Sequence, residues 1–426
     1  MRLTIQNGRL LDPASGLDRQ TSLHLNDGRI AAIGDAPAGF VAEQTIDAGG
    51  LVVAPGLVDL AARLREPGFE YRATLESEMQ AALAGGVTSL SCPPDTDPPL
   101  DEPGLVEMLK HRARGLDGAR LYPLGALTVG LKGEVITEMA ELAEAGCIGF
   151  SCGAEISVDT QTLLRAMQYA KTFGFTVWLQ PQDPQLARGG VAHGGPVAGR
   201  MGLPGVPVIA ETVALHTVFE LARATGCRVH LCRLSSAAGI ELVRQAKAQG
   251  LPVSCDVAVH HLHLTDLDIG WFDSHYRVHP PFRAQRDRDA IRAALADGTI
   301  DAICSDHTPV DDDAKLLPFA QAEPGVTGLE LLLPLTLKWA SETGIALAVA
   351  LSKITSAAAP ILGIDAGRLA PGAPADLCLF DPNEHWVLEP AQLISQGRHS
   401  PFLGCELAGR VRSTLVGGKV VYSRAG

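Results

Sequence analysis

The feature that most constrains the fold is an alternation of short apolar runs with amphipathic stretches through the middle of the chain. The apolar runs occupy residues 56–61, 87–91, 120–127, 147–151, 176–180, 228–234, 252–259 and 301–304. Stretches with helical periodicity lie between most of them, most clearly at 75–83, 105–112, 208–224, 237–249 and 286–296. Short strands that alternate with helices are typical of parallel sheets, and this series predicts an α/β protein built on a (β/α)8 TIM-like barrel.

The two ends of the chain follow a different pattern, which indicates β-structure. In the first 56 residues, Leu23 and Leu25 alternate with polar residues, and a turn is expected at Asn26-Asp27-Gly28. Near the other end, Gly417-Gly418 separates two apolar segments, as expected for a β-hairpin. We therefore predict a barrel over residues 57–365 and one small composite β domain formed by residues 1–56 together with 366–426.

Charge and composition exclude several classes of protein. The net charge of −13 disfavours binding to nucleic acid or to an anionic membrane, because phosphate groups require a basic surface. The longest apolar runs are interrupted by Asp, Gly or Pro before they reach the length of a membrane span, which is roughly 20 residues. The nine cysteines are scattered without a CxxC pair, which predicts reduced thiols and a cytoplasmic location.

Seven short motifs carry a resemblance to a known family. They are VAPGLVD at 53–59, LREPG at 64–68, VHHL at 259–262, PPFR at 280–283, SDHTP at 305–309, PGVTGLE at 324–330 and SPF at 400–402. In this order the chain resembles the dihydroorotase branch of the amidohydrolase superfamily, which interconverts carbamoyl-aspartate and dihydroorotate. The resemblance implies one or two divalent metals, held by histidines and a carboxylate or carboxylated lysine, and an aspartate that moves the proton.

The chain departs from that family pattern at the metal ligands. The expected ligands are replaced by Ala61 and Arg63 after the first strand, Ser151 and Cys152 after the fourth, Gln180 after the fifth and Arg233 after the sixth. The proton-transfer aspartate is kept as Asp306. Alanine donates nothing, and arginine is always protonated and cannot coordinate a metal. We therefore expect that the ancestral zinc site is lost and that the protein has no cofactor.

The substrate-binding positions are also altered. Arg65, the family's partner for the substrate carboxylate, is kept, whereas Asp95 stands where the family has asparagine and would repel that carboxylate. Without metals, Asp306 would be a buried anion, so we predict that Arg63 and Arg233 fill the former metal volume and that one of them donates a hydrogen bond to Asp306. We also predict that Arg65 pairs with Asp95.

Three further groups of residues have both a plain and a functional interpretation. His261 and His263 would share one face of a strand and could form a relocated metal site with His230 or Asp306 as a third ligand, although structural histidines are the simpler interpretation. Cys152 could be a nucleophile, but an inert buried thiol is the simpler interpretation. The run Asp311-Asp312-Asp313 lies where the family has a mobile loop; it is either a solvated loop or an acidic contact surface.

Two hypotheses for the function follow. The resemblance is to a pseudo-dihydroorotase, a non-catalytic chain that assembles or stabilises aspartate transcarbamoylase in pyrimidine biosynthesis, as a homodimer or in a larger hetero-oligomer. The alternative is an amidohydrolase with rearranged or mono-metal chemistry, acting on a cyclic amide such as dihydroorotate. A weaker third possibility is a sensor that keeps the pocket for such ligands.

Overall fold

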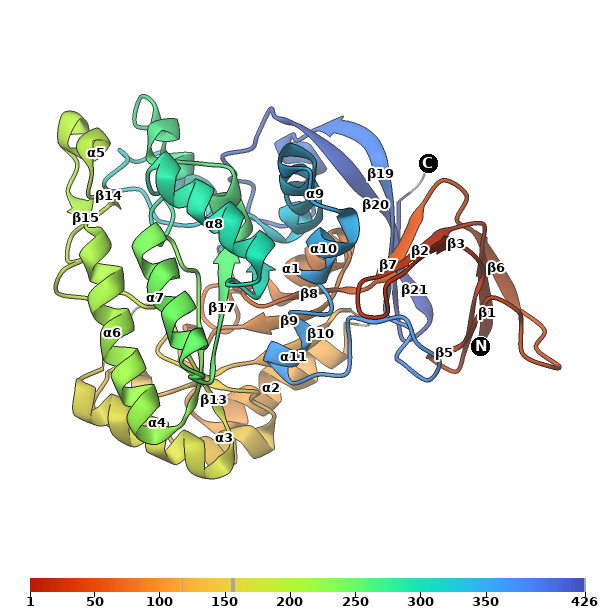
Figure 1. The fold of residues 1–426 in the computed structure, drawn as a ribbon, viewed down its shortest axis with the longest axis horizontal. Helices are drawn as coiled ribbons and strands as arrows, with labels where there is room; N and C mark the ends of the chain where they lie inside the picture. The colour runs from red at the N-terminus through yellow and green to blue at the C-terminus, as the bar shows by residue number, and fades with distance from the viewer. Residues whose placement is uncertain (117, 155–157, 425–426) are drawn as a thin grey trace.

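The computed structural model describes residues 1–116, 118–154 and 158–424. A barrel occupies the left of Figure 1, and a smaller β domain that contains both chain ends lies on its right. The predicted fold class is confirmed, with a TIM-like barrel and a composite β domain formed by both termini. Among the described residues, no helix is long and apolar enough to cross a membrane.

Parallel strands form the barrel wall. In chain order they are β8 (Leu57–Asp59), β9 (Val87–Cys92), β10 (Arg120–Pro123) with β11 (Gly125–Ala126), β12 (Phe150–Ser151), β13 (Thr176–Leu179), β16 (Arg228–Leu231), β17 (Val253–Ala258) and β18 (Ala302–Cys304). The run at 120–127 forms two short strands, one in each barrel sheet, rather than the single strand expected. A parallel bridge between Ala62 and His307 joins the segments that directly follow the first and last strands and closes the barrel.

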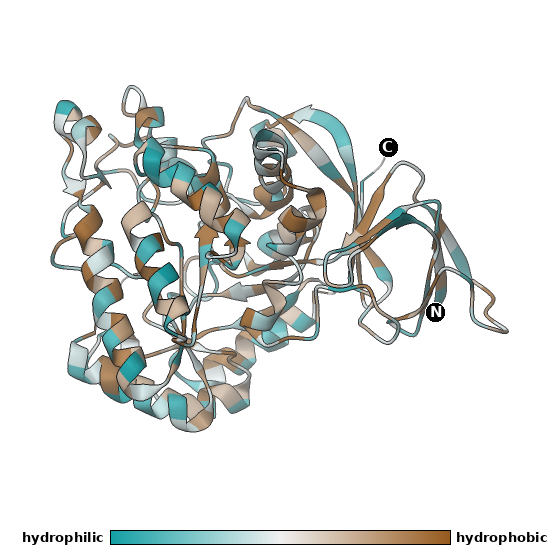
Figure 2. Ribbon diagram, viewed as in Figure 1, coloured by the Kyte–Doolittle hydropathy of each residue, from teal (hydrophilic) through white to brown (hydrophobic). Residues whose placement is uncertain are grey.

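Helices pack against the barrel strands. They are α1 (Leu75–Ala84), α2 (Pro103–Arg114), α3 (Met139–Ala145), α4 (Thr160–Phe173), α6 (Val208–Thr225), α7 (Ala237–Ala248), α8 (Gln285–Asp297), α9 (Leu332–Thr343), α10 (Leu347–Ser352) and α11 (Ala359–Leu362). Local sequence sets their ends: Asp159 caps α4 by accepting from two backbone amides, and Gly174 ends it in a left-handed conformation. Helices α7 and α8 carry apolar and polar residues on different faces (Figure 2).

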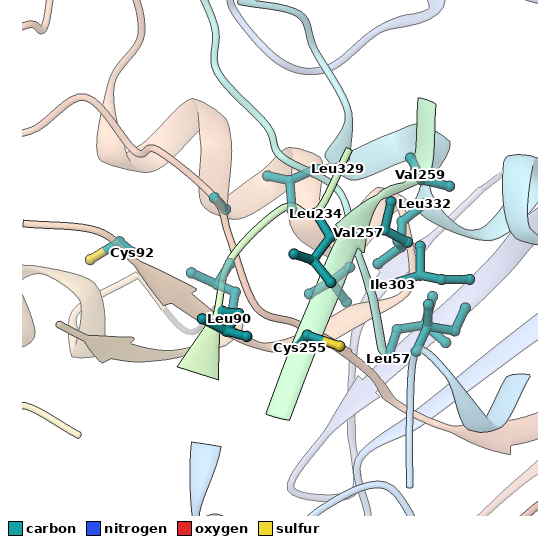
Figure 3. Packing of buried hydrophobic residues seen from close by; sticks show 14 of the residues in the cluster. Leu57, Leu90, Cys92, Leu234, Cys255, Val257, Val259, Ile303, Leu329 and Leu332 are labelled. Carbon is teal, nitrogen blue, oxygen red and sulfur yellow. The ribbon is translucent and has the colours of Figure 1, made fainter. Parts of the chain in front are cut away.

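Alternate residues of the strands face two different apolar layers. Leu57, Val257 and Ile303 point outward and pack with Leu332 of α9, as Figure 3 shows. Val58 and Trp178 belong to a separate cluster, which by the alternation of strand residues fills the barrel interior. The strands are thus buried on both sides, and polar side chains gather where the strands end.

The β domain pairs the two ends of the chain directly. One sheet has the order β5 (Arg29–Ile33), β4 (Leu23–Asn26), β1 (Arg2–Gln6) and β6 (Gln44–Asp47). The other has the order β21 (Lys419–Ser423), β20 (Glu406–Val416), β19 (Leu377–Val387), β7 (Val52–Pro55), β2 (Arg9–Asp12) and β3 (Leu17–Gln20). Both predicted turns join antiparallel strands, because Asn26 pairs with Arg29 and Val416 pairs with Lys419.

Candidate functional site

The candidate site lies at the carboxyl ends of the barrel strands, where the backbone is strained. Arg65, Arg233 and Asp306 have φ values of 64°, 53° and 46°, in the left-handed region that non-glycine residues rarely adopt. Each follows a barrel strand, namely β8, β16 and β18. Such strain persists only where surrounding contacts enforce it, and it is typical of functional sites. Three strained residues therefore follow barrel strands at this end of the barrel.

Asp306 lies between two guanidinium groups. Its Oδ1 is 3.2 Å from an Arg233 amino group and 3.6 Å from an Arg63 amino group. The Asp306 side chain is 5% exposed, so both ion pairs are largely removed from water. The predicted hydrogen bond is not formed, because Asp306 Oδ1 has no hydrogen-bond partner among the described residues. Charge neutralisation of Asp306 thus occurs by proximity and not by a directed hydrogen bond.

Asp95 pairs with a different arginine from the one expected. Arg63 Nε donates to Asp95 Oδ2 at 2.9 Å, and Arg63 NH2 lies at the same distance from that oxygen. The prediction that Arg65 holds Asp95 is wrong, because Arg65 Nε donates to the Pro309 carbonyl at 2.8 Å. Burial raises the pKa of Asp95, but the attraction of Arg63 lowers it by a larger amount. The net pKa of Asp95 is therefore below its usual value. Arg63 therefore bridges two carboxylates, Asp95 and Asp306.

Gln180 takes part in a chain of polar contacts. Its Oε1 accepts a hydrogen bond from Arg233 NH2, so its amide nitrogen is left to donate to His279 Nδ1 at 3.0 Å. His279 Nε2 lies 2.9 Å from the Gln182 side-chain nitrogen. Burial lowers the pKa of Arg233 and Asp306 raises it, with a net upward shift, so this arginine stays charged.

The residues at the family's ligand positions do not fit a divalent metal ion. The Arg63 and Arg233 guanidinium groups lie at the strand ends beside Asp306, and each would repel a divalent cation. Ala61 has only a methyl group, which cannot coordinate a metal. Ser151 Oγ accepts from the Gly153 amide, and burial raises the pKa of Cys152 to about 12, so its thiol is protonated. Among the described residues, no group of three His, Cys, Asp or Glu side chains could hold a metal ion.

A pocket of about 330 Å³ opens above these residues. Its polar lining comprises Arg63, Arg65, Arg72, Asp95, His279, Asp306, Thr308 and Glu323. Burial lowers the pKa of Arg65 to about 10, which still leaves it charged near neutral pH. Arg72 is held by Glu323 at 2.8 Å. The pocket is large enough for a small molecule, and its lining contains both cations and carboxylates.

The three histidines proposed for a relocated metal site do not come together. The strand β17 ends at Ala258, and residues 259–262 form the 3-10 helix η2 (Val259–Leu262), so His261 and His263 do not share a strand face. His230 lies among the buried polar residues, 2.8 Å from Ser254 Oγ and 3.1 Å from Asp256 Oδ2. His263 Nε2 donates to the Leu335 carbonyl at 2.9 Å. The prediction that His261 and His263 share a strand face is therefore wrong.

Sequence reasoning missed a buried pair beneath the site. His307 Nε2 lies 2.5 Å from Glu78 Oε2 of α1, and both side chains are fully buried. Glu78 also accepts from Ser395 Oγ and from the Gln396 amide, which fastens the segment before β20 to the barrel. The only sequence signal was His307 within the SDHTP motif, since its partner lies 229 residues away. His307 of the SDHTP motif therefore helps to hold α1 and the segment before β20 against the barrel.

Comparisons with known proteins agree with this architecture. Residues 50–238 match the family model "Dihydro-orotase-like", and residues 185–421 match the model "Amidohydrolase family". A "Dihydroorotase-like protein" of Pseudomonas aeruginosa is 48% identical, covering 99% of this chain and 100% of the relative. A "Dihydroorotase" of Geobacter metallireducens is 38% identical over the whole of both chains. The L-hydantoinase structure from Arthrobacter aurescens superposes with a TM-score of 0.89 at 25% identity, covering 100% of this chain and 96% of that one.

Proposed function

We propose that this chain, which belongs to the dihydroorotase-like branch of the amidohydrolase family, is a catalytically inactive subunit. In this proposal it acts in the cytoplasm as an assembly partner of the aspartate transcarbamoylase catalytic chain in pyrimidine biosynthesis. It holds no zinc and uses no other cofactor. The single observation that carries the proposal is the position of Arg63 and Arg233 against Asp306.

The electrostatics of that position support the loss of metal chemistry. A guanidinium about 4 Å from a divalent ion repels it by on the order of 8 kcal/mol at an effective dielectric of 20. Two such groups flank Asp306, and they would offset much of the binding free energy of a typical zinc site, which is about 10–16 kcal/mol. The positive charge that metals would supply is thus provided by side chains. Without a metal to generate hydroxide, Asp306 has no activated water to deprotonate.

Retention of the scaffold supports a structural role. The Glu78–His307 pair, the strained strand ends and the closed barrel are all present, although the ligand set is replaced. A partner that requires the shape but not the reaction accounts for this combination. The name "Dihydroorotase-like protein" of the Pseudomonas relatives, which are 48% and 47% identical, agrees with family membership and leaves activity open.

One observation favours a second function. Asp306 lines the open pocket together with Arg65, and several relatives at 37–39% identity are named "Dihydroorotase". This combination suits an amidohydrolase with rearranged or mono-metal chemistry that acts on a cyclic amide such as dihydroorotate. The two functions differ in whether turnover depends on Asp306 and whether a metal stays bound.

Copurification combined with an activity assay tests the proposal. Tagged protein is expressed in its own host, and the associated chains and bound metals are determined by mass spectrometry and elemental analysis. We expect stoichiometric transcarbamoylase, less than about 0.1 zinc per chain, and no interconversion of carbamoyl-aspartate and dihydroorotate. Turnover that disappears in Asp306→Ala would instead establish the amidohydrolase. A transcarbamoylase that elutes at its own size in the presence of excess protein would refute the assembly role.

A further inference from the structure

An exposed apolar surface lies beside the barrel mouth. It consists of Leu267, Trp271, Phe272, Leu316 and Leu317, which we call the Trp271 patch. Trp271 is 97% exposed and Leu316 is 79% exposed, although large apolar side chains are usually buried. The residues come from two segments, 264–276 after strand β17 and 310–323 after strand β18. Large apolar side chains exposed together on neighbouring segments typically mark an interaction site.

The backbone conformation of residues 264–276 exposes the aromatic side chains of Trp271 and Phe272 to solvent. The segment contains the 3-10 helices η3 (Asp266–Ile269) and η4 (Ser274–Tyr276), with Trp271 and Phe272 between them. Phe272 has a φ of 63°, a left-handed conformation that is strained for a bulky residue. The Asp273 amide donates to the Ile269 carbonyl at 3.1 Å and closes the turn. Strain of this kind persists only where surrounding contacts enforce it.

The two segments are fastened together. Ser274 Oγ donates to the Lys315 carbonyl, and Ile269 packs in one cluster with Phe319. Lys315 is buried, and its Nζ donates to the Arg277 and Glu323 carbonyls at 3.0 and 2.7 Å. The patch is therefore a preformed surface, which reduces the entropy lost on binding.

The charges around the patch indicate what it contacts. The exposed charged groups of the two segments are carboxylates, those of Asp268, Asp273, Asp312 and Asp313, whereas the lysine of these segments is buried. A symmetric contact with a second copy would place these carboxylates against each other. An anionic membrane would be repelled in the same way. A complementary partner offers an apolar area bordered by lysines or arginines.

We propose that the Trp271 patch is the docking surface for a different protein whose apolar contact area has a basic border. This inference rests on the proposed function, under which that protein is the aspartate transcarbamoylase chain. Trp271 supplies the central anchor, since exposed aromatic residues dominate the binding energy of such interfaces. The acidic border sets the orientation of the partner and speeds association at low salt.

Binding of purified transcarbamoylase to variants of the intact chain tests this inference. The patch variant is Trp271→Ser with Leu316→Ser, the charge variant is Asp312→Lys with Asp313→Lys, and the control is Val41→Ser, a 70% exposed residue of the β domain. We expect Kd to rise about 30-fold or more for the patch variant and several-fold for the charge variant at low salt, with no change for the control. Circular dichroism and thermal melts should be unchanged, because the replaced side chains are exposed.

The outcomes separate the two proposals. If the wild-type chain binds transcarbamoylase and the patch variant binds it equally well, the docking surface lies elsewhere and the assembly function stands. If the wild-type chain does not bind, both the assembly function and this inference fail. Sedimentation of the protein alone provides a further test. A wild-type oligomer that becomes monomeric in the patch variant would assign the patch to a second copy and overturn the inference.

Discussion

Replacing Arg63 by alanine would remove the cation that bridges two carboxylates. Arg63 Nε lies 2.9 Å from Asp95 Oδ2, and NH1 lies 3.6 Å from Asp306 Oδ1. Removing one partner of a buried ion pair costs about 3–5 kcal/mol, because the remaining charge stays buried without compensation. The Asp95 side chain is 25% exposed, so we expect Arg63→Ala to reduce the free energy of unfolding by about 2–4 kcal/mol. The control, Arg9→Ala, breaks an exposed pair with Asp18 and should cost about 0–1 kcal/mol.

The size of the Arg63→Ala effect should depend on pH in a defined direction. The pKa of Asp95 is lowered in the folded chain, since Arg63 outweighs the effect of burial. Its contribution to stability is therefore present above the unfolded pKa of about 3.9 and is lost as pH falls through the folded pKa. In Arg63→Ala, burial acts on Asp95 without the arginine and favours its protonated form. The difference in stability between wild type and variant should thus be largest near pH 7, begin to shrink as the pH falls through the raised pKa of Asp95 in the variant, and be smaller at pH 4.

Urea unfolding followed by circular dichroism at pH 7 and pH 4 measures both effects. The double variant Arg63→Ala with Asp95→Asn should recover part of the lost stability at pH 7, because it removes the uncompensated charge. Two results would refute the reasoning. One is a loss for Arg63→Ala no larger than that for Arg9→Ala, and the other is an equal loss at both pH values.

Three other predictions concern the site and its support. Ala61→His with Arg63→His should restore neither tight zinc binding nor dihydroorotase turnover, because Arg233 still lies beside Asp306; elemental analysis and a coupled assay check this. Protein dialysed against excess zinc should retain less than about 0.1 zinc per chain, and one retained zinc per chain would contradict the electrostatic argument. Glu78→Gln should lower stability by about 2–4 kcal/mol in urea unfolding, because it weakens a fully buried pair with His307; a loss below 1 kcal/mol would show that the pair is dispensable.

The sequence was informative where local pattern determines structure. Apolar periodicity located the barrel strands, and Gly417-Gly418 located the final hairpin, because both depend on neighbouring residues. Where a strand ended was less predictable. The apolar run at 252–259 continues past Ala258, yet residues 259–262 turn into a 3-10 helix, which was not expected for His261. Periodicity does not distinguish the last residue of a strand from the first residue of a turn.

Side-chain pairing was only partly predictable. The motif positions indicated that arginines would lie near Asp306, and the distances of 3.2 and 3.6 Å agree with this. The prediction that Arg65 is the partner of Asp95 was wrong. Arg65 has a left-handed backbone conformation, and its Nε donates to the Pro309 carbonyl instead. The contact between Glu78 and His307 joins residues far apart in the sequence and leaves no local pattern. Such pairings depend on the tertiary structure, and they cannot be recognised from local patterns in a single sequence.

The pairing of β7 with β19 has a consequence for how the protein is made. β7 ends at Pro55, and the strand that completes its hydrogen bonds begins at Leu377. At 5–20 residues per second, a ribosome needs roughly 15–65 s to synthesise the intervening chain. During that time the edge of β7 that pairs with β19 has no partner, and chaperones are the natural protection for such an edge. Nascent chains that stop before Leu377 would keep this edge permanently open, which makes early termination products prime substrates for proteolysis.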